Sequence, residues 1–272
     1  MSSFELVIKP HRGWQPIDFR ESYLYRELLA FLVWRDVKIR YRQTALGGLW
    51  AVFQPLLAMI IFTLIFNRLG GVHSDVPYPL FAYSGLAPWT FFSNSVSYSS
   101  NSLVGNQHLV SKVYFPRIFI PLGAIGAFLV DLFFSMSLVF VLMIYYHWSL
   151  SLRIFLLPIF VLGTLLAASG AGLMLSALNV SFRDVKYAVP FMVQMGLFVT
   201  PVIYPARYIP ARWQYLLALN PMAGMVSGFR YCLLGSALSW NMIAISFAVC
   251  AFFFIVGLLI FRRMERRFAD II

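Results

Sequence analysis

An uncharged apolar segment directly follows a cluster of basic residues near the start of the chain. Arg35, Lys38, Arg40 and Arg42 lie just ahead of residues 49–66, which contain no Asp, Glu, Lys or Arg. Basic residues beside an apolar segment hold the preceding part of the chain at the inner membrane surface and set the direction in which the chain threads. Further apolar segments follow, so we expect the chain to fold in a bilayer.

The composition supports a membrane protein. The 272 residues are 61% hydrophobic and only 11% charged, whereas soluble domains carry roughly 25% charged residues. The net charge of +11 comes from basic residues beside apolar segments. Because these form no continuous polar face, we expect no nucleic acid partner. No short apolar core with a cleavage site precedes the first apolar run, so we expect no cleavable signal peptide.

The apolar runs predict an all-α membrane protein with six transmembrane helices, since a crossing helix needs about 20 apolar residues. The expected spans are residues 49–68, 78–100, 118–146, 154–180, 187–206 and 240–261. Together they define a transmembrane domain over residues 49–262. Residues 1–48 form a cytoplasmic N-terminal segment, and residues 263–272 form a cytoplasmic tail. Residues 208–235 are apolar but broken by Asn220-Pro221, so we expect a re-entrant outer hairpin there.

Positive charge predicts the orientation. Of the 21 Lys and Arg residues, 16 precede the first span, follow the last, or lie in the second and fourth connections. The other five are Arg68, Arg153, Arg207, Arg212 and Arg230. Cytoplasmic segments are enriched in Lys and Arg. Six spans with both termini in the cytoplasm fit this asymmetry, and a seventh span would place the four arginines of the tail outside.

The segment before the first span predicts an amphipathic helix in the inner membrane interface. Leu24, Leu28, Phe31 and Leu32 recur at helical spacing among charged residues. The alternation around residues 37–42 also fits a strand, but a single strand at a membrane surface has no backbone partner. On a helix Arg35, Lys38 and Arg42 share a face that could hold a lipid head group or pyrophosphate. Simple positive-inside anchoring explains them equally, and composition favours it.

Two polar connections are candidate contact sites for a partner protein. The second is residues 101–117, where Pro116 closes any short helix. The fourth is the turn at residues 181–186. An ordinary loop and a hydrated turn are the simpler alternatives.

Motifs for chemistry within this chain are scarce. There is no GxxxxGK[ST], HExxH or GxSxG sequence, and Cys232 and Cys250 have no metal or disulfide spacing. We therefore predict no catalytic residue, no metal site and two buried apolar thiols. Asp131 is the one ionisable residue well inside a span. A proton relay is conceivable, but a structural hydrogen bond to a neighbouring helix is the favoured interpretation.

Aromatic residues gather in the second span and are followed by serines and asparagines. Such a wall suits a sugar chain, because rings cover the apolar faces of pyranoses and hydroxyls exchange hydrogen bonds. An interfacial aromatic belt with helix packing is the simpler alternative. The candidate polysaccharide-channel residues are Tyr78, Phe81, Tyr83, Trp89, Phe91, Phe92 and Tyr98.

Three long segments resemble a known family. YRELLAFLVWRDVKIRYRQTALGGLWAVFQPLL, PYPLFAYSGLAPWTFF and SLVGNQHLVSKVYFPR are similar to the permease subunits of ABC-2 type polysaccharide and O-antigen exporters. FRDV, TPVIYP and NPM extend the resemblance over nearly the whole chain. It implies a multi-pass permease of the bacterial inner membrane that exports a lipid-linked polysaccharide such as O-antigen, capsule or teichoic acid.

The resemblance also implies partners. Two permeases would assemble with two copies of a separate ABC ATPase, which binds ATP and Mg, so this chain holds no cofactor itself. The basic segment would lie near the lipid pyrophosphate, and the sugar path would follow the subunit interface with the outer hairpin at its exit. Residues of the interface helix and the two connections would dock on the ATPase. The coupling candidates are Glu27, Asn106, His108, Lys112, Tyr114, Arg117, Arg183 and Asp184.

Other function classes stay open at this stage. An ABC-2 exporter of a drug or small lipid would share most of these features. A membrane-embedded glycosyl- or phosphotransferase would need acidic pairs or metal ligands on one side, which are scarce here. A membrane scaffold without transport activity should tolerate mutation of Trp89 or Arg42.

Overall fold

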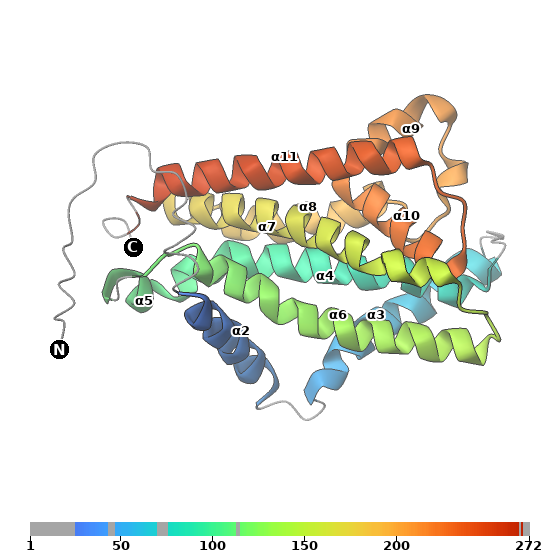
Figure 1. Cartoon of the computed structure of the whole chain (residues 1–272), viewed down its shortest axis with the longest axis horizontal. Coiled ribbons are helices and arrows are strands. Elements are labelled where there is room, and N and C mark those ends of the chain that lie inside the picture. Colours follow the sequence, from blue (N-terminus) through green and yellow to red (C-terminus); the bar gives the residue numbers. More distant parts are fainter. Residues whose placement is uncertain (1–24, 43–46, 70–75, 113–114, 267, 269–272) are drawn as a thin grey trace.

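A computed structural model describes residues 25–42, 47–69, 76–112, 115–266 and 268. These residues are helical, with turns and no strand among them. Four long helices form the body: α4 (Tyr78–Gly105), α6 (Phe119–Tyr145), α7 (Leu157–Ser181) and α11 (Trp240–Glu265). They run side by side along the longest axis of the molecule (Figure 1). The all-α fold class predicted from the apolar runs is confirmed.

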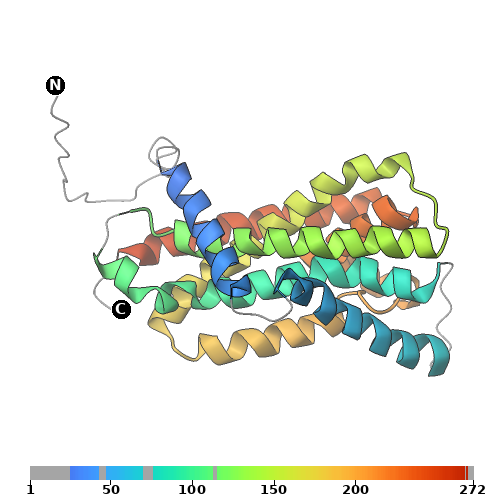
Figure 2. The same cartoon turned by 90° about the horizontal axis from the view of Figure 1, so that it is seen from below.

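Shorter helices surround this body. They are α2 (Arg26–Tyr41), α3 (Trp50–Phe62) with the helical turns η1 (Gly47–Leu49) and η2 (Thr63–Leu69), α5 (Gln107–Lys112), η3 (Leu152–Leu156), α8 (Val185–Val199), η4 (Ala206–Tyr208), α9 (Ala211–Ala218) and α10 (Pro221–Leu234). Helix α2 crosses α6 obliquely, while α3 and α8 lie along the same side of the bundle (Figure 2). Both contact α4, which is buried over most of its length.

Small residues let the long helices approach closely. A Cβ placed on Gly257 of α11 would lie 2.1 Å from the carbonyl oxygen of Gly170 on α7, so neither position has room for a side chain. Helix α2 meets α6 in the same way, since a Cβ on Gly126 would lie 2.7 Å from the side chain of Val33. Close backbone approach of this kind is typical of helix contacts in membranes.

Helix α10 begins and ends at local capping signals. Helix α10 begins where Asn220 accepts a hydrogen bond from the amide of Met222 at 3.0 Å, with Pro221 in the first turn. It ends at Gly235, which adopts a left-handed conformation with φ of 71°. With α9 it forms a helical pair at the end of the bundle opposite α5 (Figure 1).

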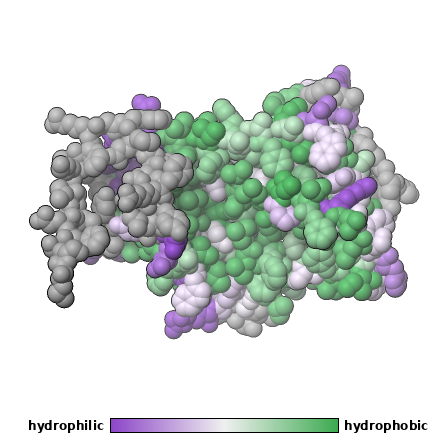
Figure 3. Space-filling view, viewed as in Figure 1, coloured by the Kyte–Doolittle hydropathy of each residue, from purple (hydrophilic) through white to green (hydrophobic). Residues whose placement is uncertain are grey.

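Among the described residues, four helical segments are long and apolar enough to cross a membrane. They are Gly47–Phe66, Phe119–Tyr145, Leu152–Ser181 and Trp240–Glu265. Helix α4 is long enough at 28 residues, but its serines and asparagines lower its hydropathy. Green apolar residues cover the middle of the face in Figure 3, and the hydrophilic residues drawn there lie mostly toward the two ends.

One predicted helix end is wrong, and another helix runs past its expected end. The span expected over residues 187–206 corresponds to α8, which ends at Val199 because the chain turns at Thr200-Pro201. Its 15 residues extend about 22 Å at 1.5 Å per residue. The helix of the second span continues to Gly105, five residues past the end at residue 100 that we expected. Residues of α2 are helical, as expected, and the strand alternative for residues 37–41 is excluded.

Candidate functional site

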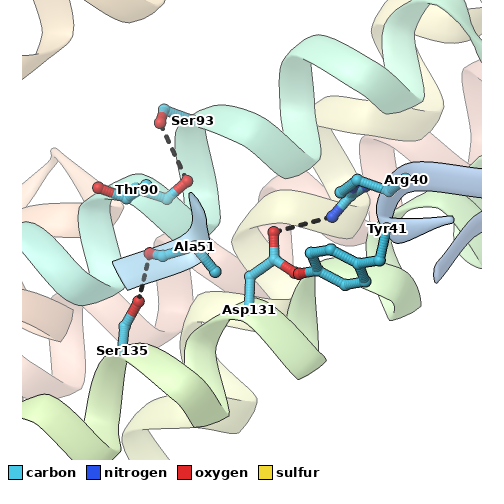
Figure 4. A network of polar contacts seen from close by, with 7 residues as sticks. All are labelled: Arg40, Tyr41, Ala51, Thr90, Ser93, Asp131 and Ser135. Carbon is cyan, nitrogen blue, oxygen red and sulfur yellow. Dashed lines mark hydrogen bonds and ion pairs between the residues drawn. The ribbon is translucent and has the colours of Figure 1, made fainter. Parts of the chain in front are cut away.

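The carboxylate of Asp131 joins α6 to the end of α2. Arg40 Nη1 donates a hydrogen bond to Asp131 Oδ2 at 2.8 Å, and the Tyr41 hydroxyl donates to Oδ1 (Figure 4). The Arg40 guanidinium also lies 3.5 Å from the ring centroid of Phe128. These contacts confirm the structural hydrogen bond expected for Asp131. They also neutralise a carboxylate that would be costly to leave unpaired inside a bilayer.

A cavity of about 230 Å³ lies beside this ion pair. The end of α2, the start of α3 and the middles of α4 and α6 surround it. Its walls combine aromatic rings, side-chain amides and hydroxyls with the Arg40–Asp131 pair. The lining residues are Arg40, Tyr41, Gly47, Trp50, Ala51, Gln54, Ala87, Thr90, Phe91, Asn94, Tyr98, Phe128, Asp131, Leu132 and Ser135.

A second polar link holds the wall of this cavity. The Ser135 hydroxyl donates to the backbone carbonyl of Ala51 at 3.1 Å and ties α6 to α3 (Figure 4). On α4, the Ser93 hydroxyl donates to the carbonyl of Thr90 at 3.1 Å. The Ser135 bond uses a backbone carbonyl of α3, so it positions α6 against α3 without consuming the side-chain amides that face the cavity. The Ser93 bond lies within α4 and leaves the Thr90 hydroxyl unused.

The four basic residues predicted to hold a head group do not form one cluster. Arg35 pairs with the neighbouring Asp36 at 2.8 Å, and Arg40 turns toward Asp131. Lys38 is exposed, with its ammonium 4.5 Å from the ring centroid of Trp34, and Arg42 is also exposed. Arg40 therefore serves an interhelical contact, which spacing on α2 alone did not indicate.

Most aromatic candidates of the second span lie inside the bundle of a single chain. Tyr78, Phe81, Tyr83, Trp89 and Phe91 are buried, whereas Phe92 is half-buried and Tyr98 is 59% exposed. The Tyr78 hydroxyl donates to the carbonyl of Ile203 at 2.7 Å. Of the seven, Phe91 and Tyr98 line the cavity.

Arg230 is a functional candidate that sequence analysis missed. We counted it among the basic residues of the outer side, but Arg230, which belongs to α10, has a buried side chain. Nη1 donates to the carbonyl of Pro201 at 2.6 Å, Nη2 donates to that of Val202, and the guanidinium lies 3.6 Å from the ring centroid of Phe81. It thereby binds carbonyls just beyond the end of α8, where the chain leaves the helix. An arginine inside an otherwise uncharged run was the available signal.

The coupling candidates occupy the end of the bundle that carries α5. His108 and Lys112 are exposed on α5, Arg183 and Asp184 on the turn before α8, and Glu27 on the first turn of α2. Asn106 donates through its amide to the carbonyl of Ser102 at 2.8 Å, which caps α4. Tyr114 lies outside the described residues.

Arg117 differs from the other coupling candidates because it is engaged within the chain. Its Nη1 donates to the backbone carbonyl of Glu265 at 2.7 Å, and its own amide donates to the Glu265 carboxylate at 3.2 Å. Glu265 also pairs with Arg262 at 3.0 Å. The start of α6 is thereby joined to the end of α11.

The described residues contain no group of three or more His, Cys, Asp or Glu side chains that could hold a metal ion. Cys232 and Cys250 are free and buried. The site is therefore one of helix contacts and cavity walls within a multi-pass helical membrane protein.

The chain belongs to the ABC-2 type transporter family, whose model matches residues 27–234. It is 30% identical over 253 residues to an O-antigen export system permease protein, RfbA, of Klebsiella pneumoniae, a match that covers 92% of this chain and 96% of that protein. An O-antigen export system permease protein of Myxococcus xanthus is 34% identical over 215 residues, a match that covers 78% of this chain and 82% of that protein. The polysialic acid transport protein KpsM of Escherichia coli is 26% identical over 244 residues, and this match covers 85% of this chain and 91% of that protein.

Proposed function

We propose that this chain is the transmembrane permease subunit of an ATP-driven exporter that moves a lipid-linked polysaccharide across the bacterial inner membrane. The observation that carries the proposal is the match to O-antigen export permeases over 92% of the chain. The match to a polysialic acid transport protein extends the support to a second class of polysaccharide. The cavity, with its rings and amides, is compatible with sugar chemistry.

The membrane topology that we propose has six crossings, made by α3 with η2, α4, α6, η3 with α7, α8 and α11. Both termini would face the cytoplasm. The basic residues at the α5 end support this direction: Lys112, Arg117, Arg183, Lys186, Arg262, Arg263 and Arg266. Helices α9 and α10 would form a re-entrant outer hairpin, since a seventh crossing would place the arginines at the end of α11 on the outer side.

The assembly that we propose contains two permeases and two copies of a separate ABC ATPase. ATP and Mg would bind to the ATPase, and this chain would be its channel-forming partner without catalytic residues. Exposed charges on α2, α5 and the turn before α8 provide polar contacts for a cytoplasmic subunit. Exposed Lys38 and Arg42 would lie near the pyrophosphate of the substrate.

Deletion of the gene in a polysaccharide-producing strain tests the proposal. Polymer should accumulate inside the cell and disappear from the surface, and the wild-type gene should restore export. Normal surface polymer in the deletion strain would contradict the proposal, and unchanged polymer with altered resistance to drugs would favour a drug exporter. Robust ATP hydrolysis by the purified permease without its partner would contradict the assignment of ATP hydrolysis to a separate subunit.

A further inference from the structure

We propose that the cavity between α2, α3, α4 and α6 is a binding site for one neutral pyranose unit of the transported polymer. This inference rests on the proposed export function and adds a position and a sugar class to it. A volume of about 230 Å³ is below the ~300–1,000 Å³ of sites for drug-sized ligands. The cavity therefore suits a single pyranose ring better than a longer segment of the polysaccharide.

The amides that line the cavity have unused hydrogen-bonding capacity. No hydrogen bond joins the side-chain amide of Gln54 or Asn94 to another residue of the described ranges. Each amide offers two donors and an acceptor, as the hydroxyls of a pyranose require. The Thr90 hydroxyl lies on the same wall.

The cavity lies deep within the expected bilayer, where unsatisfied amides are unusual. Asp131 is the thirteenth residue of α6, so it lies about 18 Å along the helix axis from Phe119. The hydrocarbon core of a bilayer is about 30 Å thick. Polar groups at this depth are costly unless water or a polar ligand satisfies them. A sugar that crosses the membrane needs such groups along its path.

Aromatic rings supply the second half of a sugar site. Trp50 and Tyr98 keep about half of their surface exposed although they line the cavity. Phe128 is held in place by Tyr98, whose ring centroid lies 5.0 Å away in an edge-to-face arrangement. Flat rings cover the apolar C–H faces of a pyranose while the amides bind its hydroxyls.

The charges select a neutral sugar over a phosphate or an acidic sugar. Among the described residues that line the cavity, Arg40 is the one with a cationic side chain, and Asp131 already neutralises it at 2.8 Å. The Phe128 face covers part of the same guanidinium. An anion in the cavity would have to displace Asp131 and lie beside its uncompensated carboxylate, which is unfavourable. The pyrophosphate of the substrate would therefore bind elsewhere.

Substituted-cysteine labelling tests the proposal in intact membranes. The natural thiols, Cys232 and Cys250, are fully buried, so background labelling should be low. Asn94→Cys and Gln54→Cys each place a thiol in the cavity, and Leu152→Cys, at an 83% exposed position away from it, is the matched control. Each full-length variant is produced with its ATPase partner in a hydrolysis-deficient form, which holds polymer in the transporter. Labelling with N-ethylmaleimide is compared between cells that make the polymer and cells that cannot.

Polymer should slow the labelling of Asn94→Cys and Gln54→Cys about tenfold when its concentration is about ten times the dissociation constant. The rate for Leu152→Cys should not change, and inorganic pyrophosphate should not protect the cavity thiols. Equal rates with and without polymer, protection by pyrophosphate, or no labelling of either cavity thiol would each overturn the sugar site. These outcomes differ from failure of the export function itself, which appears as normal surface polymer in the deletion strain.

Discussion

Asp131, midway along α6, lies 2.8 Å from the guanidinium of Arg40 near the end of α2. The two residues are 91 positions apart in the sequence. Their contact attaches a helix expected at the inner membrane surface to a span of the bundle, and it closes one side of the cavity. A movement of α2 would therefore change the wall of the cavity directly.

Asp131→Ala should destabilise the permease by about 1–3 kcal/mol, because it leaves Arg40 without its carboxylate partner. The expected cost is below that of a fully buried pair, since both side chains keep some exposure. Thermal unfolding in nanodiscs measures the effect. Arg40→Ala combined with Asp131→Ala should recover part of the loss.

In Asp131→Asn the amide oxygen can still accept from Arg40, and the amide nitrogen can donate to the Tyr41 hydroxyl, which reverses the direction of that bond. The variant should therefore retain expression and export. A titratable carboxylate is required only if Asp131 relays protons. Normal expression of Asp131→Asn with complete loss of export would therefore contradict the structural role and favour a relay.

Gly257→Ala should destabilise the contact between α7 and α11 by about 1–3 kcal/mol through overpacking. The added methyl group would lie 2.1 Å from the Gly170 carbonyl oxygen. Gly105→Ala is the matched control, because a Cβ at the end of α4 meets no atom within 4 Å. Recovery of folded protein by size-exclusion chromatography should fall for the first variant only. Equal recovery of both variants would show that the helices separate at little cost.

Arg230→Ala should destabilise the packing of α10 against the segment that follows α8, because the carbonyls of Pro201 and Val202 lose their buried donor. Loss of such donors costs about 1–3 kcal/mol. Arg153→Ala, which removes one exposed bond to the Gly235 carbonyl, should change stability little. Thermal unfolding of the two variants checks the difference. A similar melting temperature for both would mean that Arg230 is dispensable for this packing.

Lys112→Glu and Arg183→Glu should weaken the co-purification of the ATPase, because both charges are exposed at the proposed docking end. Ser149→Glu, exposed at the opposite end, serves as the control. Pull-down of the tagged permease followed by quantification of the bound ATPase gives the measurement. If Ser149→Glu alone reduces binding, the proposed orientation is wrong.

Much of the helical arrangement was predictable from one sequence. Runs of apolar residues predicted the helices that became α3, α6, α7 and α11, because only regular helices satisfy their backbone in lipid. The sequence at Asn220-Pro221 predicted a break between two helical segments, and α10 begins there because Asn220 caps it and Pro221 fits its first turn. The end of α8 was mispredicted because apolar composition continues past Val199, although the backbone turns there.

The candidate site depended on contacts that no local pattern encodes. Composition and periodicity determined a helical membrane protein with a basic segment and one acidic residue in a span, since these are properties of neighbouring residues. Only the packing of α2 against α6 decided that Arg40 pairs with Asp131. Only the packing of α10 against α4 decided that Arg230 is buried. Both outcomes arise from residues far apart in the chain, whose meeting depends on how whole helices cross in space.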